Sequence, residues 1–228
     1  MEEEPYLSSR YFLYIAISFV AVLIISNTVA VKLIKIGPLV LSGATLIFPI
    51  SYIFGDILTE VYGYRASRKI IWSGFATLVF MSLVYWIVQI IPSPVFWEGQ
   101  SAYEAILGAV PRIVVASMVA YFIGEFSNSF VLSKMKVWTN GRSLWARTIG
   151  STVVGEGVDS LIFALLAFCG TMPLSALFNL VFSIYCFKVV YEVIITPLTY
   201  LIVNKLKKAE GIDVYDRGVN YNPFALKD

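Results

Sequence analysis

The chain has 228 residues, of which 58% are hydrophobic and only 14% are charged, and its net charge is +2. Because a water-soluble domain carries roughly 25% charged residues, this composition excludes an ordinary globular protein and indicates a polytopic membrane protein. Histidine is absent from the sequence, and the two cysteines, Cys169 and Cys186, fit neither a disulfide framework nor a zinc site. We therefore expect no metal site and interpret both cysteines as apolar packing residues. We also expect no cofactor and no direct contact with nucleic acid, although the net charge itself is uninformative about nucleic acid.

Six apolar segments follow one another along the chain, each long enough to cross a hydrocarbon layer of about 30 Å. Open strands in lipid would leave backbone polar groups unpaired, so we predict helices, an all-α class and a single integral-membrane domain over residues 1–228. Three spans in each half would allow a 3+3 inverted repeat. The predicted spans are residues 11–31, 39–60, 70–91, 107–133, 144–169 and 174–204.

Lysine and arginine residues predict how these spans are oriented. Basic residues gather in the loops after the second and fourth spans and after the sixth span, and Arg10 precedes the first span, whereas the opposite loops hold only Lys32 and Lys35. Loops on the cytoplasmic side of a membrane carry the excess of positive charge. Both termini are therefore expected in the cytoplasm.

Charged side chains interrupt these apolar segments, although each costs about 2.5–3.5 kcal/mol at the centre of a bilayer. They must therefore face one another or a wet cavity. Spacings of three and four residues place them on common helix faces together with polar and aromatic residues. The charged positions are Asp56 and Glu60 in the second span, Arg112 and Glu125 in the fourth, Glu156 and Asp159 in the fifth, and Lys188 and Glu192 in the sixth.

The six acids in this set outnumber the two bases, Arg112 and Lys188, so pairing alone cannot neutralise them. Some carboxyl groups must be protonated, solvated, close to cytoplasmic basic residues, or waiting for donors from a ligand. An acid-rich interior lined by aromatic rings suits a planar solute with several N–H groups, a cation, or a proton relay. The residues themselves thus favour a transporter of small molecules without specifying the solute.

Purely structural roles are also open for several of these residues. Lys188 could lock the helices together through an ion pair with Asp159 or Glu192. Arg112 could extend towards the lipid headgroups at the outer end of its span. Asn27, near the outer end of the first span, could form a hydrogen bond between helices.

Two carboxylates one helical turn apart, Asp56 and Glu60, stand near the inner end of the second span. Asp56 is expected to continue the polar stripe of that span into the cavity, near its cytoplasmic mouth. Glu60 is expected to pair with Arg65 and Arg68 of the following basic loop. Together the two acids could form an inner gate that pairs and parts during transport.

Four stretches of the sequence resemble the conserved blocks of one transporter family, in the same order and over almost the whole chain. They are "FPISYIFGDILTEVYGYRASR" at 48–68, "PRIVVASMVAYFIGEF" at 111–126, "LWARTIGSTVVGEGVDSLIF" at 144–163 and "KVVYEVIITPLTYLIVNKLKKAEGIDVYD" at 188–216. With these blocks the chain resembles the queuosine precursor transporter family, also called the vitamin uptake transporter family.

The resemblance implies an importer, rather than an enzyme, in the cytoplasmic (inner) membrane of a prokaryote. Its cargo would be the 7-deazaguanine bases preQ0 and preQ1, which feed the synthesis of queuosine in tRNA. A carboxylate can accept the ring N–H and the amine of such a base together, and we favour Asp159 or Glu156 because they lie deepest and are least neutralised. The expected substrate-binding residues are Asn27, Phe48, Tyr52, Asp56, Arg112, Ser117, Tyr121, Glu156, Asp159 and Lys188, and the expected gating or proton-relay residues are Glu60, Glu125 and Glu192.

Other functions remain open at this level. The chain could be the substrate-binding subunit of a partner-driven vitamin or nucleobase importer of the energy-coupling-factor type, since it has no G-x-x-x-x-G-K-[ST] loop for ATP. Glu156 and Asp159 could instead be the acid pair of an intramembrane enzyme. A structural scaffold should tolerate the loss of its buried acids. A homodimer is the default expectation for the oligomeric state.

Overall fold

The structure is a computed structural model that describes residues 9–36, 39–108, 110–168 and 173–225. Within those residues, six helical segments are long and apolar enough to cross a membrane, which confirms the polytopic all-α class. Cys186 is half-buried with a free thiol, whereas Cys169 lies outside the described residues. The long helices are α1 (Phe12–Val29), α2 (Phe48–Ile57), α3 (Tyr64–Ile90), α5 (Val110–Trp138), α6 (Leu144–Phe168) and α7 (Leu174–Glu210).

The region predicted as the second span is divided into several short elements, and a short helix lies in the loop before α5. Residues 39–42, predicted as the start of a membrane helix, instead form strand β2 (Leu39–Ser42), which pairs antiparallel with β1 (Leu33–Ile36). A 3-10 turn (Gly43–Leu46) follows, and α2 begins only at Phe48, where Pro49 fits because the first helical turn has no partner for its N–H groups. A π-helical turn, η3 (Leu58–Tyr62), ends this span, and α4 (Gln100–Leu107) precedes α5.

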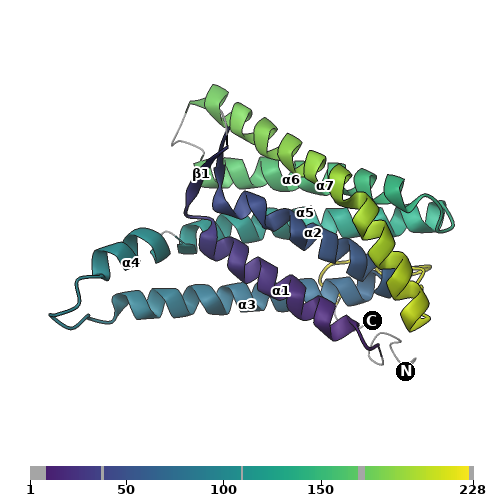
Figure 1. Ribbon diagram of the computed structural model, residues 1–228, viewed down its shortest axis with the longest axis horizontal. Coiled ribbons are helices and arrows are strands. Elements are labelled where there is room, and N and C mark those ends of the chain that lie inside the picture. The colour runs from purple at the N-terminus through teal and green to yellow at the C-terminus, as the bar shows by residue number, and fades with distance from the viewer. Residues whose placement is uncertain (1–8, 37–38, 109, 169–172, 226–228) are drawn as a thin grey trace.

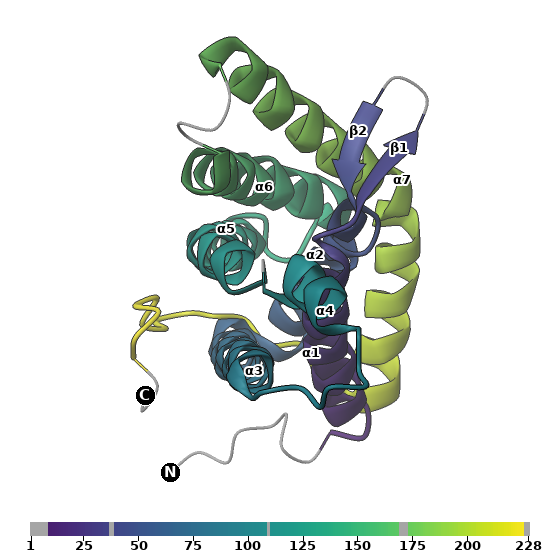
Figure 2. The same cartoon turned by 90° about the vertical axis from the view of Figure 1, so that its left-hand side faces the viewer.

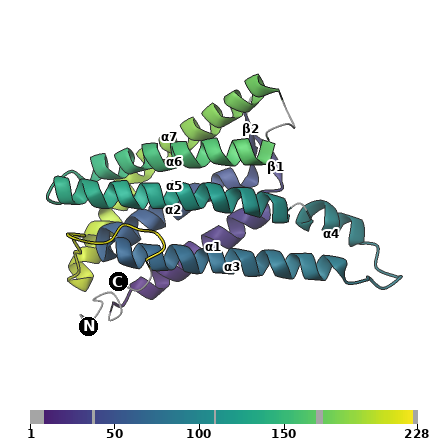
Figure 3. The ribbon, with the colours of Figure 1, turned by 180° about the vertical axis from the view of Figure 1, so that it is seen from behind.

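The helices surround α2. Figure 2 shows α3, α5 and α6 in one layer and α7 on the opposite side, with α2 and α1 between them. Accordingly, 61% of the span Gly43–Tyr62 is buried, compared with at most 39% of any other span that the structure describes. The β-hairpin and α4 lie at one end of the bundle, and the start of α1 and the end of α7 lie at the other (Figures 1 and 3). Following the orientation predicted from lysine and arginine, we call these the outer end and the inner end.

Backbone features determine how α5 packs against α6 and where α7 bends. Gly124 of α5 and Gly155 of α6 face each other so closely that a Cβ on either would lie 2.9–3.0 Å from the other's carbonyl oxygen. Such small residues let membrane helices approach with their backbones. In α7, Pro197 cannot donate a hydrogen bond to the preceding turn, and the helix bends in its second half (Figure 1). The inner half of α7 packs against α2 and η3, and Glu210 near its end accepts the N–H of Tyr11, just before α1, at 2.8 Å.

The segment after α7 folds back under the bundle and completes the junction between η3 and α3. Val214 donates its N–H to the carbonyl of Val61, 3.2 Å away. Both carboxylate oxygens of Asp216 accept the N–H of Tyr64 at 3.1 Å, and Ser133 donates to the same carboxylate at 2.6 Å. Burial raises the pKa of Asp216, while these hydrogen bonds partly oppose the rise. Asp216 thus satisfies a free N–H at the start of α3, as a capping residue does.

Gly63 provides a test of this junction. It has φ +88°, and a Cβ there would lie 2.7 Å from Cγ1 of Val214 and 3.0 Å from Oδ1 of Asp216. Gly63→Ala should therefore add a steric clash to a backbone strain of about 1–3 kcal/mol and lower the melting temperature of the purified protein. Gly218→Ala is the matched control, because Gly218 also has positive φ, +74°, but has no atom within 4 Å of its Cβ position. Equal losses in the two variants would contradict the proposed packing of the segment after α7.

Candidate functional site

A pocket lies among the outer halves of the spans. Helices α1, α2, α5, α6 and α7 contribute to it, with polar or small side chains from α1, α5, α6 and α7 and the aromatic ring of Phe48 from α2. Of the residues expected to bind substrate, Asn27, Phe48, Ser117, Asp159 and Lys188 line this pocket. The remaining lining residues are Ser26, Ala30, Ala44, Thr45, Ser160, Phe163 and Ile184.

Lys188 is the charged centre of the pocket wall. Its Nζ lies 2.6 Å from Oδ2 of Asp159 and 2.6 Å from Oε2 of Glu156, and 4.7 Å from the centre of the Phe48 ring. The expected pair with Asp159 is therefore present, but the second partner is Glu156 rather than Glu192. The idea that Asp159 and Glu156 are the least neutralised acids is wrong, because the two share this lysine. One cation between two carboxylates still leaves a net negative charge beside the pocket.

Three aromatic rings separate the pocket from the interior. Phe48, Tyr52 and Tyr121 pack edge to face, with ring centres 5.3–5.9 Å apart. Only Phe48 lines the pocket, whereas Tyr52 and Tyr121 are fully buried one layer further in. Gly124 leaves the space that the Tyr52 hydroxyl occupies, since a Cβ there would lie 2.8 Å from that oxygen. Direct stacking on a ligand is therefore available to Phe48 in this conformation.

Beyond the aromatic layer lies a second group of buried polar residues, which we call the acid cluster: Asp56, Glu125, Asn128 and Glu192. Asn128 donates from Nδ2 to Oδ1 of Asp56 at 2.8 Å. Glu125 packs against Gly55, which has no side chain to exclude it, and Asp56 interacts electrostatically with both Glu125 and Glu192. Among the described residues, no lysine or arginine forms an ion pair with any of the three acids. Asp56, expected to contact substrate, lies outside the pocket lining.

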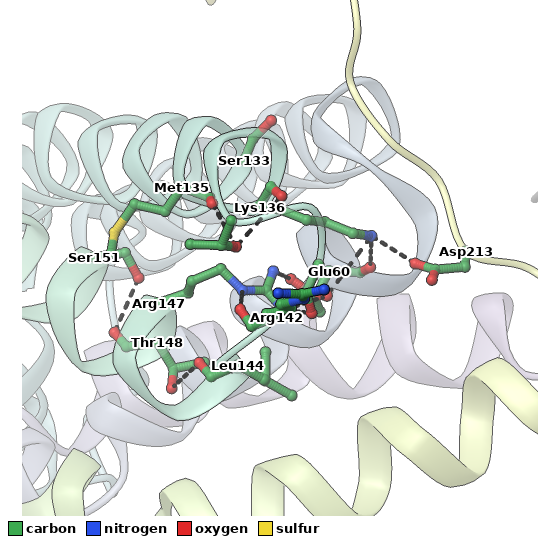
Figure 4. Close-up of polar contacts among 12 residues, drawn as sticks. Glu60, Ser133, Met135, Lys136, Arg142, Leu144, Arg147, Thr148, Ser151 and Asp213 are labelled. Atoms are coloured by element: carbon green, nitrogen blue, oxygen red, sulfur yellow. Dashed lines mark hydrogen bonds and ion pairs between the residues drawn. The ribbon is translucent and has the colours of Figure 1, made fainter.

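Glu60 is the centre of a buried ion cluster at the inner end (Figure 4). The guanidinium of Arg147 donates to both of its carboxylate oxygens, and Nζ of Lys207 lies 2.6 Å from Oε1. The expected pairing with Arg65 and Arg68 is wrong. Gly63 turns the chain between Glu60 and α3, and Arg68 instead donates to the backbone carbonyls at 220 and 222. The partners of Glu60 therefore come from other helices rather than from its own loop.

The segment after α7 completes this ion cluster. Lys136 of α5 donates to the carbonyl of Glu60 at 2.6 Å and to Oδ1 of Asp213 at 2.7 Å, and Lys207 reaches the same oxygen of Asp213 at 3.0 Å. Burial opposes ionisation of Asp213, but the hydrogen bonds and positive charges of the two lysines hold its pKa below the usual value. Figure 4 shows Lys136 between Glu60 and Asp213. Helices α5, α6 and α7 and the segment after α7 are thus tied to the end of α2.

Arg112 lies outside the pocket lining, and two polar residues of α5 were not among the predicted site residues. Arg112 is exposed at the outer end, where it donates to the carbonyl of Ala167 at 3.3 Å, and it does not line the pocket. Asn128 and Lys136 were missed. Both lie on the polar face of α5, beyond Glu125 and at helical spacing from it. Continuing the pattern of polar residues past Glu125 would have identified them.

Six membrane spans around a polar interior, with a pocket near one end and an ion cluster at the other, define a multi-pass membrane protein of the transporter class. Residues 42–202 match the sequence model of the family described as "Putative vitamin uptake transporter", and the chain belongs to this family.

Relatives of known name support this assignment. The chain is 29% identical over 82% of both chains to the "Probable queuosine precursor transporter" of Bacillus subtilis, and 25% identical to the "Queuosine precursor transporter" of Escherichia coli, over 71% of this chain and 72% of the relative. It is also 26% identical to a "Probable queuosine precursor transporter" of Haemophilus influenzae, over 54% of this chain and 50% of the relative. No solved structure matches the chain.

The Lys188 group yields a stability prediction. Lys188→Met leaves Glu156 and Asp159 buried without a cation, and removing one partner of a buried pair costs about 3–5 kcal/mol. The variant should therefore melt well below the wild type in detergent. Adding Glu156→Gln and Asp159→Asn removes the orphaned charges and should recover most of the loss, and Lys188→Arg serves as the charge-conserving control. A triple variant no more stable than Lys188→Met would contradict this account.

Proposed function

We propose that this chain imports queuosine precursors, the 7-deazaguanine bases preQ0 and preQ1, across the cytoplasmic membrane by alternating access. The observation that carries the proposal is the Asp159–Lys188 pair beside Phe48 in the wall of the pocket. The names of the relatives supply the class of cargo, and the family supplies the activity.

The pocket offers the groups that a deazaguanine needs. Lys188 engages one lone pair of Oδ2 of Asp159, so Oδ1 is assigned to accept one N–H of the base edge and the second lone pair of Oδ2 to accept the other. Lys188 or Asn27 would donate to the adjacent carbonyl, and Phe48 would pack against the ring face. Asn27 is positioned for this by its own hydrogen bond to the carbonyl of Leu23 at 2.9 Å. The surplus negative charge also favours preQ1, whose aminomethyl group is a cation.

Alternating access requires that one end of the path close while the other opens. In this structure the pocket lies near the outer end, and the Glu60 cluster joins four parts of the chain at the inner end. We assign the structure to a state closed towards the cytoplasm. Release of cargo into the cell then requires Glu60 to part from Arg147 and the two lysines.

Uptake of labelled preQ0 by proteoliposomes that contain this chain alone tests the proposal. Saturable uptake that unlabelled preQ1 competes is the expected result. Asp159→Asn should lower initial uptake at low substrate concentration by about tenfold or more, since a hydrogen bond to a charged group contributes about 1.5–3 kcal/mol. Glu104→Gln, on the exposed face of α4, is the matched control and should transport as the wild type does.

Two other outcomes separate the alternatives. Thermal stabilisation by preQ0 without transport would assign the chain as the binding subunit of a partner-driven importer. Neither stabilisation nor transport with preQ0 or preQ1 would contradict the proposed cargo. Unchanged uptake by the Asp159→Asn variant would leave the proposed cargo standing but overturn the proposed role of that carboxylate.

A further inference from the structure

We propose that the acid cluster of Asp56, Glu125, Asn128 and Glu192 is a proton-binding site that couples import to the proton gradient, with Asp56 as its central carboxyl. The inference rests on the proposed transport function and adds its energy source. The acid cluster lies on the polar face of α2 between the pocket and the Glu60 cluster, because Phe48, Asp56 and Glu60 follow one another along that span.

Unsatisfied acceptors are the first argument. Oδ2 of Asp56, Oε1 of Glu192 and Oδ1 of Asn128 have no hydrogen-bond partner among the described residues, whereas Glu125 has the hydroxyls of Ser129 and Tyr121 beside it. All four side chains of the acid cluster are at most 2% exposed. Buried acceptors without donors are unfavourable, and the cost is greater for charged groups. A proton on one carboxyl removes a charge and supplies the donor that the neighbouring acceptors lack.

The surrounding charges are the second argument, because none of the nearby cations is available to the acid cluster. Lys188 of α7 forms ion pairs with Glu156 and Asp159 of α6, at 2.6 Å from each. At the inner end, Arg147, Lys136 and Lys207 form ion pairs with Glu60. The uncharged titratable neighbours are Tyr52 of α2 and Tyr121 of α5. Lowering the net negative charge of the acid cluster therefore requires a cation from solution.

The identity of that cation follows from the ligand set. Among the described residues, no group of three histidine, cysteine or acidic side chains is arranged to hold a metal ion. A proton needs only one carboxyl and one acceptor. Oδ2 of Asp56 and Oδ1 of Asn128 both lack a partner among the described residues, and the two side chains are held together because Nδ2 of Asn128 donates to Oδ1 of Asp56 at 2.8 Å. The structure therefore favours a proton over a metal ion at this site.

The position of Asp56 links the proton to the gate. The π-helical turn η3 begins two residues after Asp56 and carries Glu60. Interrupted spans and π-helical turns recur at functional sites of membrane transporters. A proton bound from the outside would neutralise Asp56 while the pocket fills, and it would leave to the cytoplasm when the Glu60 cluster opens. One proton and one neutral base then cross together in each cycle.

The test uses proteoliposomes that contain the full chain, with the membrane potential held at zero and labelled preQ0 as the probe. With the outside one pH unit more acidic, wild-type protein should accumulate preQ0 up to about tenfold above equilibrium, the limit for one proton per neutral solute. Asp56→Asn resembles the protonated acid in shape but cannot release a proton. It should still exchange labelled for unlabelled preQ0, yet bring the solute only to equilibrium. Glu104→Gln is the control and should accumulate preQ0 as the wild type does.

The outcomes separate this inference from the proposed function. Exchange by the wild type without accumulation under the pH gradient would overturn proton coupling and leave transport intact. Accumulation by Asp56→Asn, or accumulation driven by a sodium gradient instead, would also overturn it. Absence of exchange in the wild type would contradict the transport function itself. If Asp56→Asn does not reach the membrane folded, Glu192→Gln takes its place in the same assay.

Discussion

The structure depends on the cost of burying the carboxylate of Glu60 at the inner end of the central span. A buried charge is tolerated only when it is paired and hydrogen-bonded. Glu60 meets this requirement with Arg147 from α6, Lys207 from α7 and Lys136 from α5. Those cations would repel one another without further acid, and Asp213 supplies it. The need to satisfy one carboxylate thus brings three helices and the segment after α7 to the same point.

The polar interior is ordered along α2 rather than spread through the bundle. A paired group around Lys188 borders the pocket, an aromatic layer follows, and the acid cluster and the Glu60 cluster come next. The charges at both ends of this series are paired, whereas those in the middle have no basic partner among the described residues. This order matches the proposed coupled import, which requires a group that recognises the cargo, a carboxyl that binds a proton and an ion cluster that can open.

Composition and spacing predicted the membrane class, the six spans and most of the polar residues because lipid penalises every unpaired charge in the same way. The partners of those residues could not be predicted. Glu60 pairs across the bundle because Gly63 and the π-helical turn redirect it, and neither feature is visible as a periodic pattern. Lys136 and Asp213 resembled ordinary cytoplasmic charges in the sequence. The β-hairpin was missed because its apolar residues continue directly into the second span.

The central claim is that the path is closed at the inner end by the Glu60 cluster and reached from the outer end. Labelling of Ser117→Cys with a membrane-impermeant maleimide, after replacement of Cys169 and Cys186, tests it directly. The account predicts labelling from the outer face that preQ0 suppresses and little labelling from the inner face, with inner labelling increased when Lys207→Gln weakens the Glu60 cluster. Equal labelling from both faces, unaffected by Lys207→Gln, would contradict the account.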